Sequence, residues 1–141
     1  MNKIEKSNFI RLVGRWKTTG FLKSNHEDQK IVGIDTYELI LDGNYIMHHA
    51  DVSLGKNKSQ TIEMITYDRS LDKGVMHYFN SMGQEGKMLS SIIGNEFRIE
   101  GQNLKFLGHF SDEDTSIKGN WYSQSKVGDW VEYIELILEK Q

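Results

Sequence analysis

Residues 31–54, IVGIDTYELILDGNYIMHHADVSL, carry the clearest signal of the fold. They hold two runs, Ile31–Leu41 and Tyr45–Leu54, that are rich in the β-branched and aromatic residues that favour strands. Asp42-Gly43-Asn44 lies between the runs, and these residue types tolerate the positive φ angles of a tight turn. This segment therefore predicts two antiparallel strands joined as a hairpin.

The rest of the chain repeats this alternation of strand and turn. Ser7 can cap a short helix over Asn8–Val13, in which Phe9 and Leu12 share one apolar face. Trp16 lies just beyond this helix, and we expect it to pack in the interior beneath it. From residue 31 onward, no gap is long enough for the crossover that parallel strands need, so neighbouring strands should pair antiparallel. The further strands are expected at Arg15–Leu22, Ser59–Asp68, Val75–Ser81, Lys87–Ile93, Glu96–Glu100, Leu104–Phe110, Ser116–Ser123 and Asp129–Leu138.

Composition supports an all-β domain. The chain has 141 residues, the size of a single domain spanning 1–141. It contains one alanine against 14 Ile, 6 Val and 6 Thr, and its turns rely on 13 glycines because it has no proline. A meander of about ten strands leaves exposed edges unless it closes on itself. We therefore expect an antiparallel up-and-down β-barrel with one short N-terminal helix.

Composition also excludes several kinds of partner and compartment. The absence of cysteine excludes disulfides, cysteine nucleophiles and cysteine metal sites. A net charge of −3 and a pI near 5.9 argue against a nucleic-acid partner. The sequence shows no secretory leader and no apolar run long enough to cross a membrane. The expectation is a cytoplasmic protein that does not insert into membranes.

A series of short motifs resembles a known family. Gly14-Arg15-Trp16 follows directly on the expected helix, and the motifs Tyr37–Gly43, Tyr67-Asp68, Phe79–Gly83, Ile117–Trp121 and Gly128–Trp130 follow in order. Together they resemble the lipocalin-like, calycin-type bacterial β-barrels catalogued as a domain of unknown function, which share a Gly-x-Trp motif. The resemblance spans about residues 9–140. It implies an up-and-down barrel with an internal cavity and no particular ligand.

The sequence departs from the secreted lipocalins in two ways. It lacks their disulfides, and it lacks the arginine near the last strand that packs on the motif tryptophan in those proteins. Its C-terminal part offers Lys118, Lys126 and Lys140 instead. Both departures favour the intracellular relatives.

Alternation along the strands predicts which side chains line the cavity. We expect the more apolar face of each strand to point inward, although both faces of Ile31–Leu41 and Lys87–Ile93 carry apolar residues. The candidate ligand-binding residues are Trp16, His48, Met64, His77, Phe79, Phe106, Trp121, Trp130, Glu132 and Ile134. A mostly apolar lining with a few polar groups is typical of a small-molecule pocket. The function predicted is binding of a small hydrophobic molecule, and the alternative is a core filled by these side chains.

The histidines decide the polarity expected of that ligand. His48 and His77 are the only cationic candidates on the predicted inward faces, so a neutral or weakly anionic ligand is expected, with any carboxylate head on a histidine. No metal site is expected, because adjacent His48 and His49 face opposite sides of a strand. His77 lies two strands from His48, roughly 10 Å away.

Catalytic motifs are absent from the sequence. It contains no Gly-x-Ser-x-Gly elbow and no glycine-rich phosphate loop. We therefore assign no catalytic residue and no cofactor. Two further alternatives stay open: an enzyme that acts on a small hydrophobic substrate, with His77 and Glu132 as an acid–base pair, and a haem protein that uses His48, His77 or His109.

Overall fold

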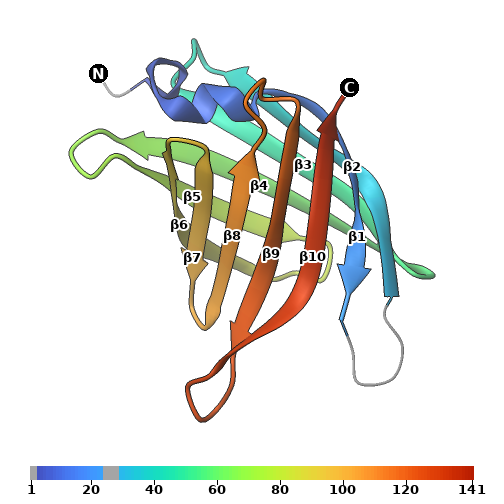
Figure 1. Ribbon diagram of the computed structural model, residues 1–141. Helices are drawn as coiled ribbons and strands as arrows, with labels where there is room; N and C mark the ends of the chain where they lie inside the picture. The colour runs from blue at the N-terminus through green and yellow to red at the C-terminus, as the bar shows by residue number, and fades with distance from the viewer. Residues whose placement is uncertain (1–2, 24–28) are drawn as a thin grey trace.

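The computed structural model describes residues 3–23 and 29–141. Its ten strands form a closed barrel in which each strand pairs antiparallel with its neighbours in sequence (Figure 1). This confirms the predicted all-β meander. The strands are β1 Gly14–Leu22, β2 Gln29–Ile40, β3 Tyr45–Leu54, β4 Asn57–Asp68, β5 Lys73–Asn80, β6 Glu85–Ile93, β7 Glu96–Gly101, β8 Leu104–Phe110, β9 Ser116–Gln124 and β10 Trp130–Lys140.

The first and last strands close the barrel. β1 pairs with β10 from Trp16 opposite Lys140 to Leu22 opposite Ile134. Gly20 lies in this seam, and a Cβ atom added there would stand 1.9 Å from the carbonyl oxygen of Glu135. Only glycine lets the two closing strands approach this closely at that position.

The N-terminal helix differs from the expected one. Two short 3₁₀ helices, η1 Ile4–Lys6 and η2 Asn8–Leu12, stand in place of a single helix over Asn8–Val13. The Ser7 side chain accepts a hydrogen bond from the Phe9 backbone N–H at 3.2 Å, so the predicted cap is confirmed. The two helices lie across one end of the barrel, at the top of Figure 1. Among the described residues, neither helix has the length or the apolar character needed to cross a bilayer.

An apolar core fills the end of the barrel beneath these helices. Trp16 is fully buried there, and its Nε1–H donates a hydrogen bond of 2.8 Å to the Leu12 carbonyl. The Lys140 ammonium stands 5.1 Å from the centre of the Trp16 ring. The buried cluster that contains Trp16 includes Ile4, Phe9, Leu12, Ile46, Ile65, Met76 and Ile92, and it is continuous with buried residues such as Phe97, Phe106 and Ile117. The helices thus plug this end with packed side chains.

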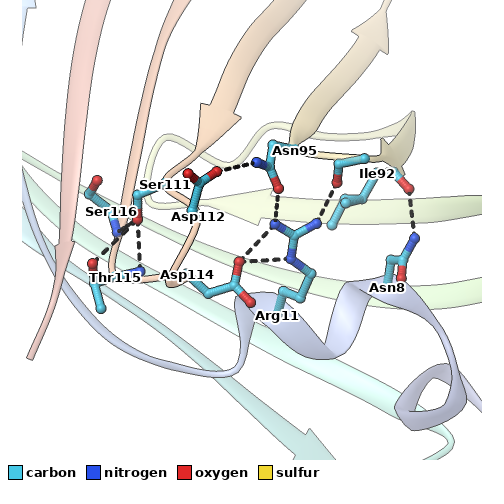
Figure 2. Close-up of polar contacts among 10 residues, drawn as sticks. Asn8, Arg11, Ile92, Asn95, Ser111, Asp112, Asp114, Thr115 and Ser116 are labelled. Atoms are coloured by element: carbon cyan, nitrogen blue, oxygen red, sulfur yellow. Dashed lines mark hydrogen bonds and ion pairs between the residues drawn. The ribbon is translucent and has the colours of Figure 1, made fainter.

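The Arg11 side chain forms hydrogen bonds that connect η2 to two hairpin loops (Figure 2). Its Nε and Nη2 atoms donate to Asp114 Oδ1 at 2.9 and 2.7 Å, and Nη2 also donates to Asn95 Oδ1 at 2.7 Å. Its Nη1 donates to the Gly94 carbonyl, and its guanidinium lies 4.4 Å from the centre of the Phe110 ring. One side chain therefore joins the N-terminal plug, formed by η1 and η2, to the β6–β7 and β8–β9 connections.

The predicted inward faces of β4 and β5 are wrong. Glu63 and Ile65 are buried on β4 while Ile62 is exposed, so Met64 points away from the interior with Ile62. On β5, Met76 is buried and Phe79 is exposed, so the set Val75, His77 and Phe79 also faces outward. The apolar-face rule failed because the outer faces of these strands are apolar and the inner face of β4 carries a carboxylate.

The predicted face of β10 is only half correct. Its pairing with β9 shifts by one residue between Glu132 and Ile134, which is the register change of a β-bulge. Ile134, Leu136 and Leu138 follow the inward alternation beyond the bulge. Trp130 and Glu132 lie before it and are exposed, so neither belongs to the interior.

Candidate functional site

A cavity of about 100 Å³ lies inside the barrel. Its walls are mostly apolar, and its polar residues come from the adjacent strands β2, β3 and β4. The apolar lining consists of Met88, Phe97, Ile99, Phe106, Ile117, Trp121, Leu136 and Leu138, and the polar lining of Asp35, Tyr37, His48 and Glu63. The cavity is therefore an apolar chamber with one polar end.

His48 joins two carboxylates at the polar end. Its Nε2 atom lies 2.6 Å from Asp35 Oδ1, and its Nδ1 atom lies 2.9 Å from Glu63 Oε1. Cross-strand register explains the grouping, because His48 stands opposite Tyr37 on β2 and opposite Glu63 on β4. The three side chains are 12% (His48), 11% (Asp35) and 7% (Glu63) exposed, so this charged cluster is almost entirely removed from water.

The carboxylates keep His48 protonated. Burial lowers the pKa of His48, but hydrogen bonds and charge attraction from Asp35 and Glu63 outweigh it and raise the pKa from 6.5 to about 9. At neutral pH His48 is an imidazolium that donates one N–H to each carboxylate. The Tyr37 ring stacks on it, with ring centres 3.9 Å apart. Burial, then the negative charges of Asp35 and Glu63, raise the pKa of Tyr37 well above 10, so its phenol stays neutral.

Two polar groups of the cluster remain free. Asp35 uses both oxygens, since Oδ2 accepts a hydrogen bond from the Thr18 hydroxyl. Glu63 uses only Oε1; its Oε2 and the Tyr37 hydroxyl make no hydrogen bond to any residue that the structure describes. Among those residues, no fully buried polar side-chain atom lacks a partner. These two groups are therefore not fully buried, and both residues line the cavity.

The structure brings together only part of the predicted site. His48, Phe106 and Trp121 line the cavity, and Ile134 lies beside Trp121 in the sheet. Trp16 does not line the cavity; it belongs to the apolar core beneath the N-terminal helices. The predicted residues that lie on the outer surface instead are Met64, His77, Phe79, Trp130 and Glu132.

The proposed acid–base pair of His77 and Glu132 does not form. The His77 ring packs on Phe79 with ring centres 4.6 Å apart. Glu132 accepts a hydrogen bond from Asn120 instead. Both pairs lie on the outside of the barrel, on strands far apart in the sheet order.

Sequence reasoning missed Asp35, Tyr37 and Glu63. The signal that could have found the first two is the hairpin itself, since its turn at residues 42–44 places Tyr37 opposite His48, and Asp35 lies two residues before Tyr37 on the same face. In the next pairing, Glu63 stands opposite His48. Opposite charges on cross-strand neighbours attract, and this attraction offsets the cost of burying Glu63.

The cluster is not arranged to hold a metal ion or haem iron. No set of three or more metal-ligating side chains with suitable geometry occurs within residues 3–23 and 29–141. An axial histidine needs a free ring nitrogen for the iron, and both nitrogens of His48 face carboxylates. Neither nitrogen is free to accept a proton from a substrate. The geometry is that of a fixed pattern of charge and hydrogen-bonding groups.

Comparison with known proteins identifies the family. No curated protein matches the chain. The crystal structure of Rv2717c from M. tuberculosis resembles it with a TM-score of 0.74 over 100% of this chain and 98% of that one. At 8% sequence identity, this similarity concerns the fold alone. Residues 3–129 match the family described as "Protein of unknown function (DUF1579)", and the chain belongs to that family.

Proposed function

We propose that this protein binds a small hydrophobic molecule inside a lipocalin-like barrel, with Gly14-Arg15-Trp16 as its Gly-x-Trp motif. The observation that carries the proposal is the cavity of about 100 Å³ with apolar walls and free polar groups at one end. Pockets of this make-up hold the body of a ligand by apolar contact and orient it by a few polar groups.

Aromatic contacts support the walls of the cavity. Phe106 packs against Trp121 at 5.3 Å and against Phe97 at 5.7 Å between ring centres. Met88 lines the same space, and its unbranched side chain adapts to differently shaped ligands. The binding site thus combines fixed aromatic surfaces with one adaptable side chain.

Cavity size restricts the ligand. An engineered protein cavity of about 150 Å³ holds benzene, so 100 Å³ suits a molecule of roughly four or five non-hydrogen atoms. A long-chain fatty acid is larger than this space, so most of it would lie outside the cavity. The carboxylate head expected from the sequence also lacks a partner, because Asp35 and Glu63 already occupy both nitrogens of His48.

Tryptophan fluorescence tests the proposal, with 1-butanol as the probe. At the ceiling of about 1.5 kcal/mol per non-hydrogen atom, a molecule of this size binds at best with a Kd of a few micromolar, so the titration should extend to millimolar concentrations. We expect a saturable change that Trp121→Phe abolishes. The control Trp130→Phe, on the outer surface, should preserve it.

Amide chemical shifts in a two-dimensional NMR spectrum provide a second measurement that does not depend on fluorescence. Saturable shifts should cluster on the strands that line the cavity. If no small apolar probe of this size, charged or neutral, causes a saturable fluorescence change or such shifts, the interior is a filled core and the proposal is wrong.

A further inference from the structure

The polar end of the cavity carries an excess of negative charge. Two carboxylates, Asp35 and Glu63, face one imidazolium, His48, which leaves one negative charge unbalanced. No lysine or arginine is among the described residues that line the cavity. An unbalanced charge in a space this apolar is costly, and such arrangements are found preferentially at functional sites.

The polar atoms of the cluster that lack a hydrogen-bond partner also favour a positively charged ligand, because they can act as acceptors. The Glu63 side chain is 7% exposed, and its Oε2 is an acceptor that no described residue serves. Each oxygen of Asp35 already accepts a hydrogen bond, from Thr18 or from His48, so Glu63 is the carboxylate with an unpaired oxygen to offer a ligand. The neutral Tyr37 hydroxyl, from a residue that lines the same cavity, can accept a second hydrogen bond. What the cluster lacks is a positively charged donor.

The walls suit such a donor and an apolar tail. Phe97, Phe106 and Trp121 present aromatic rings to the cavity, and aromatic faces attract cations. The lining also contains aliphatic side chains, which offer only hydrocarbon; they include Ile99, Leu136 and Leu138. A ligand with an ammonium head and a short alkyl body matches both parts of the lining.

We propose that the ligand class of this cavity is small apolar amines in their ammonium form, with the nitrogen donating to Glu63 Oε2. This inference rests on the proposed binding function and adds to it the charge and the hydrogen-bonding group of the ligand. The ammonium neutralises the excess negative charge, and it has further N–H groups to donate to other acceptors of the lining, such as the Tyr37 hydroxyl. A carboxylate of the same size meets like charge, and the donors that the described residues of the lining leave unpaired, the Tyr37 hydroxyl and the Trp121 indole N–H, carry no charge to offset it.

Three probes of nearly equal size test the charge preference at neutral pH. Butylammonium, 1-butanol and butyrate share the alkyl chain and differ in the head group. By calorimetry or NMR titration, we expect butylammonium to bind at least about tenfold more tightly than 1-butanol, as a charge-assisted hydrogen bond to a buried carboxylate implies. Butyrate should bind most weakly.

Two matched variants locate the effect. Glu63→Gln keeps the size of the side chain and an oxygen for His48, and it should remove the preference for butylammonium while 1-butanol still binds. Glu38→Gln removes the same charge from the exposed outer face of β2 and should leave the preference intact. Added salt should barely change it, because screening acts on exposed charges more than on buried ones.

The outcomes distinguish failure of the amine assignment from failure of the proposed ligand-binding function. If butylammonium and 1-butanol bind equally in the wild-type protein, the amine assignment is wrong while ligand binding stands. The amine assignment is also wrong if Glu38→Gln abolishes the preference as fully as Glu63→Gln, because the charge effect would then be general. If none of the three probes binds, both proposals are wrong.

Discussion

At the scale of single residues, His48 organises the interior. It holds Asp35 and Glu63 through its two ring nitrogens and packs flat against Tyr37. Burying these charges costs free energy of desolvation, and only the close pairing within the cluster offsets it. Removing His48 would leave two carboxylates in an apolar barrel without the cation that pairs with them.

This coupling makes stability depend on pH. Because the folded-state pKa of His48 is about 9 and the unfolded value is 6.5, its contribution is complete below about pH 6.5 and is lost as the pH rises through 9. We expect the free energy of unfolding in urea to fall by about 3 kcal/mol over that interval, at about 1.4 kcal/mol per pKa unit.

An NMR titration of the His48 ring measures the same pKa directly. His109→Gln, which removes an exposed imidazole, should retain the pH dependence of stability, whereas His48→Gln should lose most of it. An apparent His48 pKa near 6.5 in the folded protein would contradict the paired cluster.

At the scale of elements, the N-terminal plug depends on one arginine. The 3₁₀ helix η2 has five residues, too few to be stable alone, and tertiary contacts must hold it in place. Arg11 supplies several of them at once, to Asp114, Asn95, Gly94 and Phe110. Its side chain is mostly buried, so these contacts are shielded from solvent better than an ordinary surface ion pair.

Arg11→Ala should therefore destabilise the protein by about 1–3 kcal/mol, the range for losing hydrogen bonds of a charged group. Arg15→Ala, which removes an exposed arginine from β1, should change stability by less than about 0.5 kcal/mol. Chemical denaturation of both variants measures the difference. Equal effects would show that the Arg11 contacts contribute little.

The bulge in β10 shows how a single element redirects side chains. Alternation counted back from Ile134 puts Glu132 and Trp130 inside, and the one-residue register shift turns them out. Outside, the Trp130 ring lies 4.3 Å from the Lys105 ammonium. A single irregular residue thus removed two predicted residues from the cavity.

At the scale of the whole molecule, closure between β1 and β10 completes the sheet. Every strand then has two partners, so no described strand presents an open edge. The seam also adjoins the cavity, since Leu136 and Leu138 of β10 belong to its lining. Closure and the shape of the binding site are therefore linked.

A substitution in the seam tests this link. In Gly20→Ala, the added methyl group would collide with the Glu135 backbone, and the seam must open to accommodate it. We expect a loss of about 1–3 kcal/mol, as for overpacking, and faster amide hydrogen exchange in β1 and β10 than in β4. Lys17→Ala, on the exposed face of β1, should leave both quantities nearly unchanged.

Local sequence patterns were sufficient to predict the number and order of the strands, the all-β class and the burial of Trp16 beneath the N-terminal residues. β-Branched runs favour strands, while Gly, Asn and Asp mark the turns. Short gaps also force neighbouring strands to pair antiparallel. His48, Phe106 and Trp121 were identified in the same way, because on their strands the apolar face is also the inner face.

The inward faces of β4, β5 and β10, and with them the polar end of the cavity, became known only from the assembled barrel. Both faces of β4 carry apolar residues, so alternation alone does not distinguish them. Glu63 is inside because its carboxylate pairs there with His48, which also pairs with Asp35. These three residues become neighbours only when β2, β3 and β4 pair in register. The free energy of that pairing exists only when the strands are together, so no single strand encodes it.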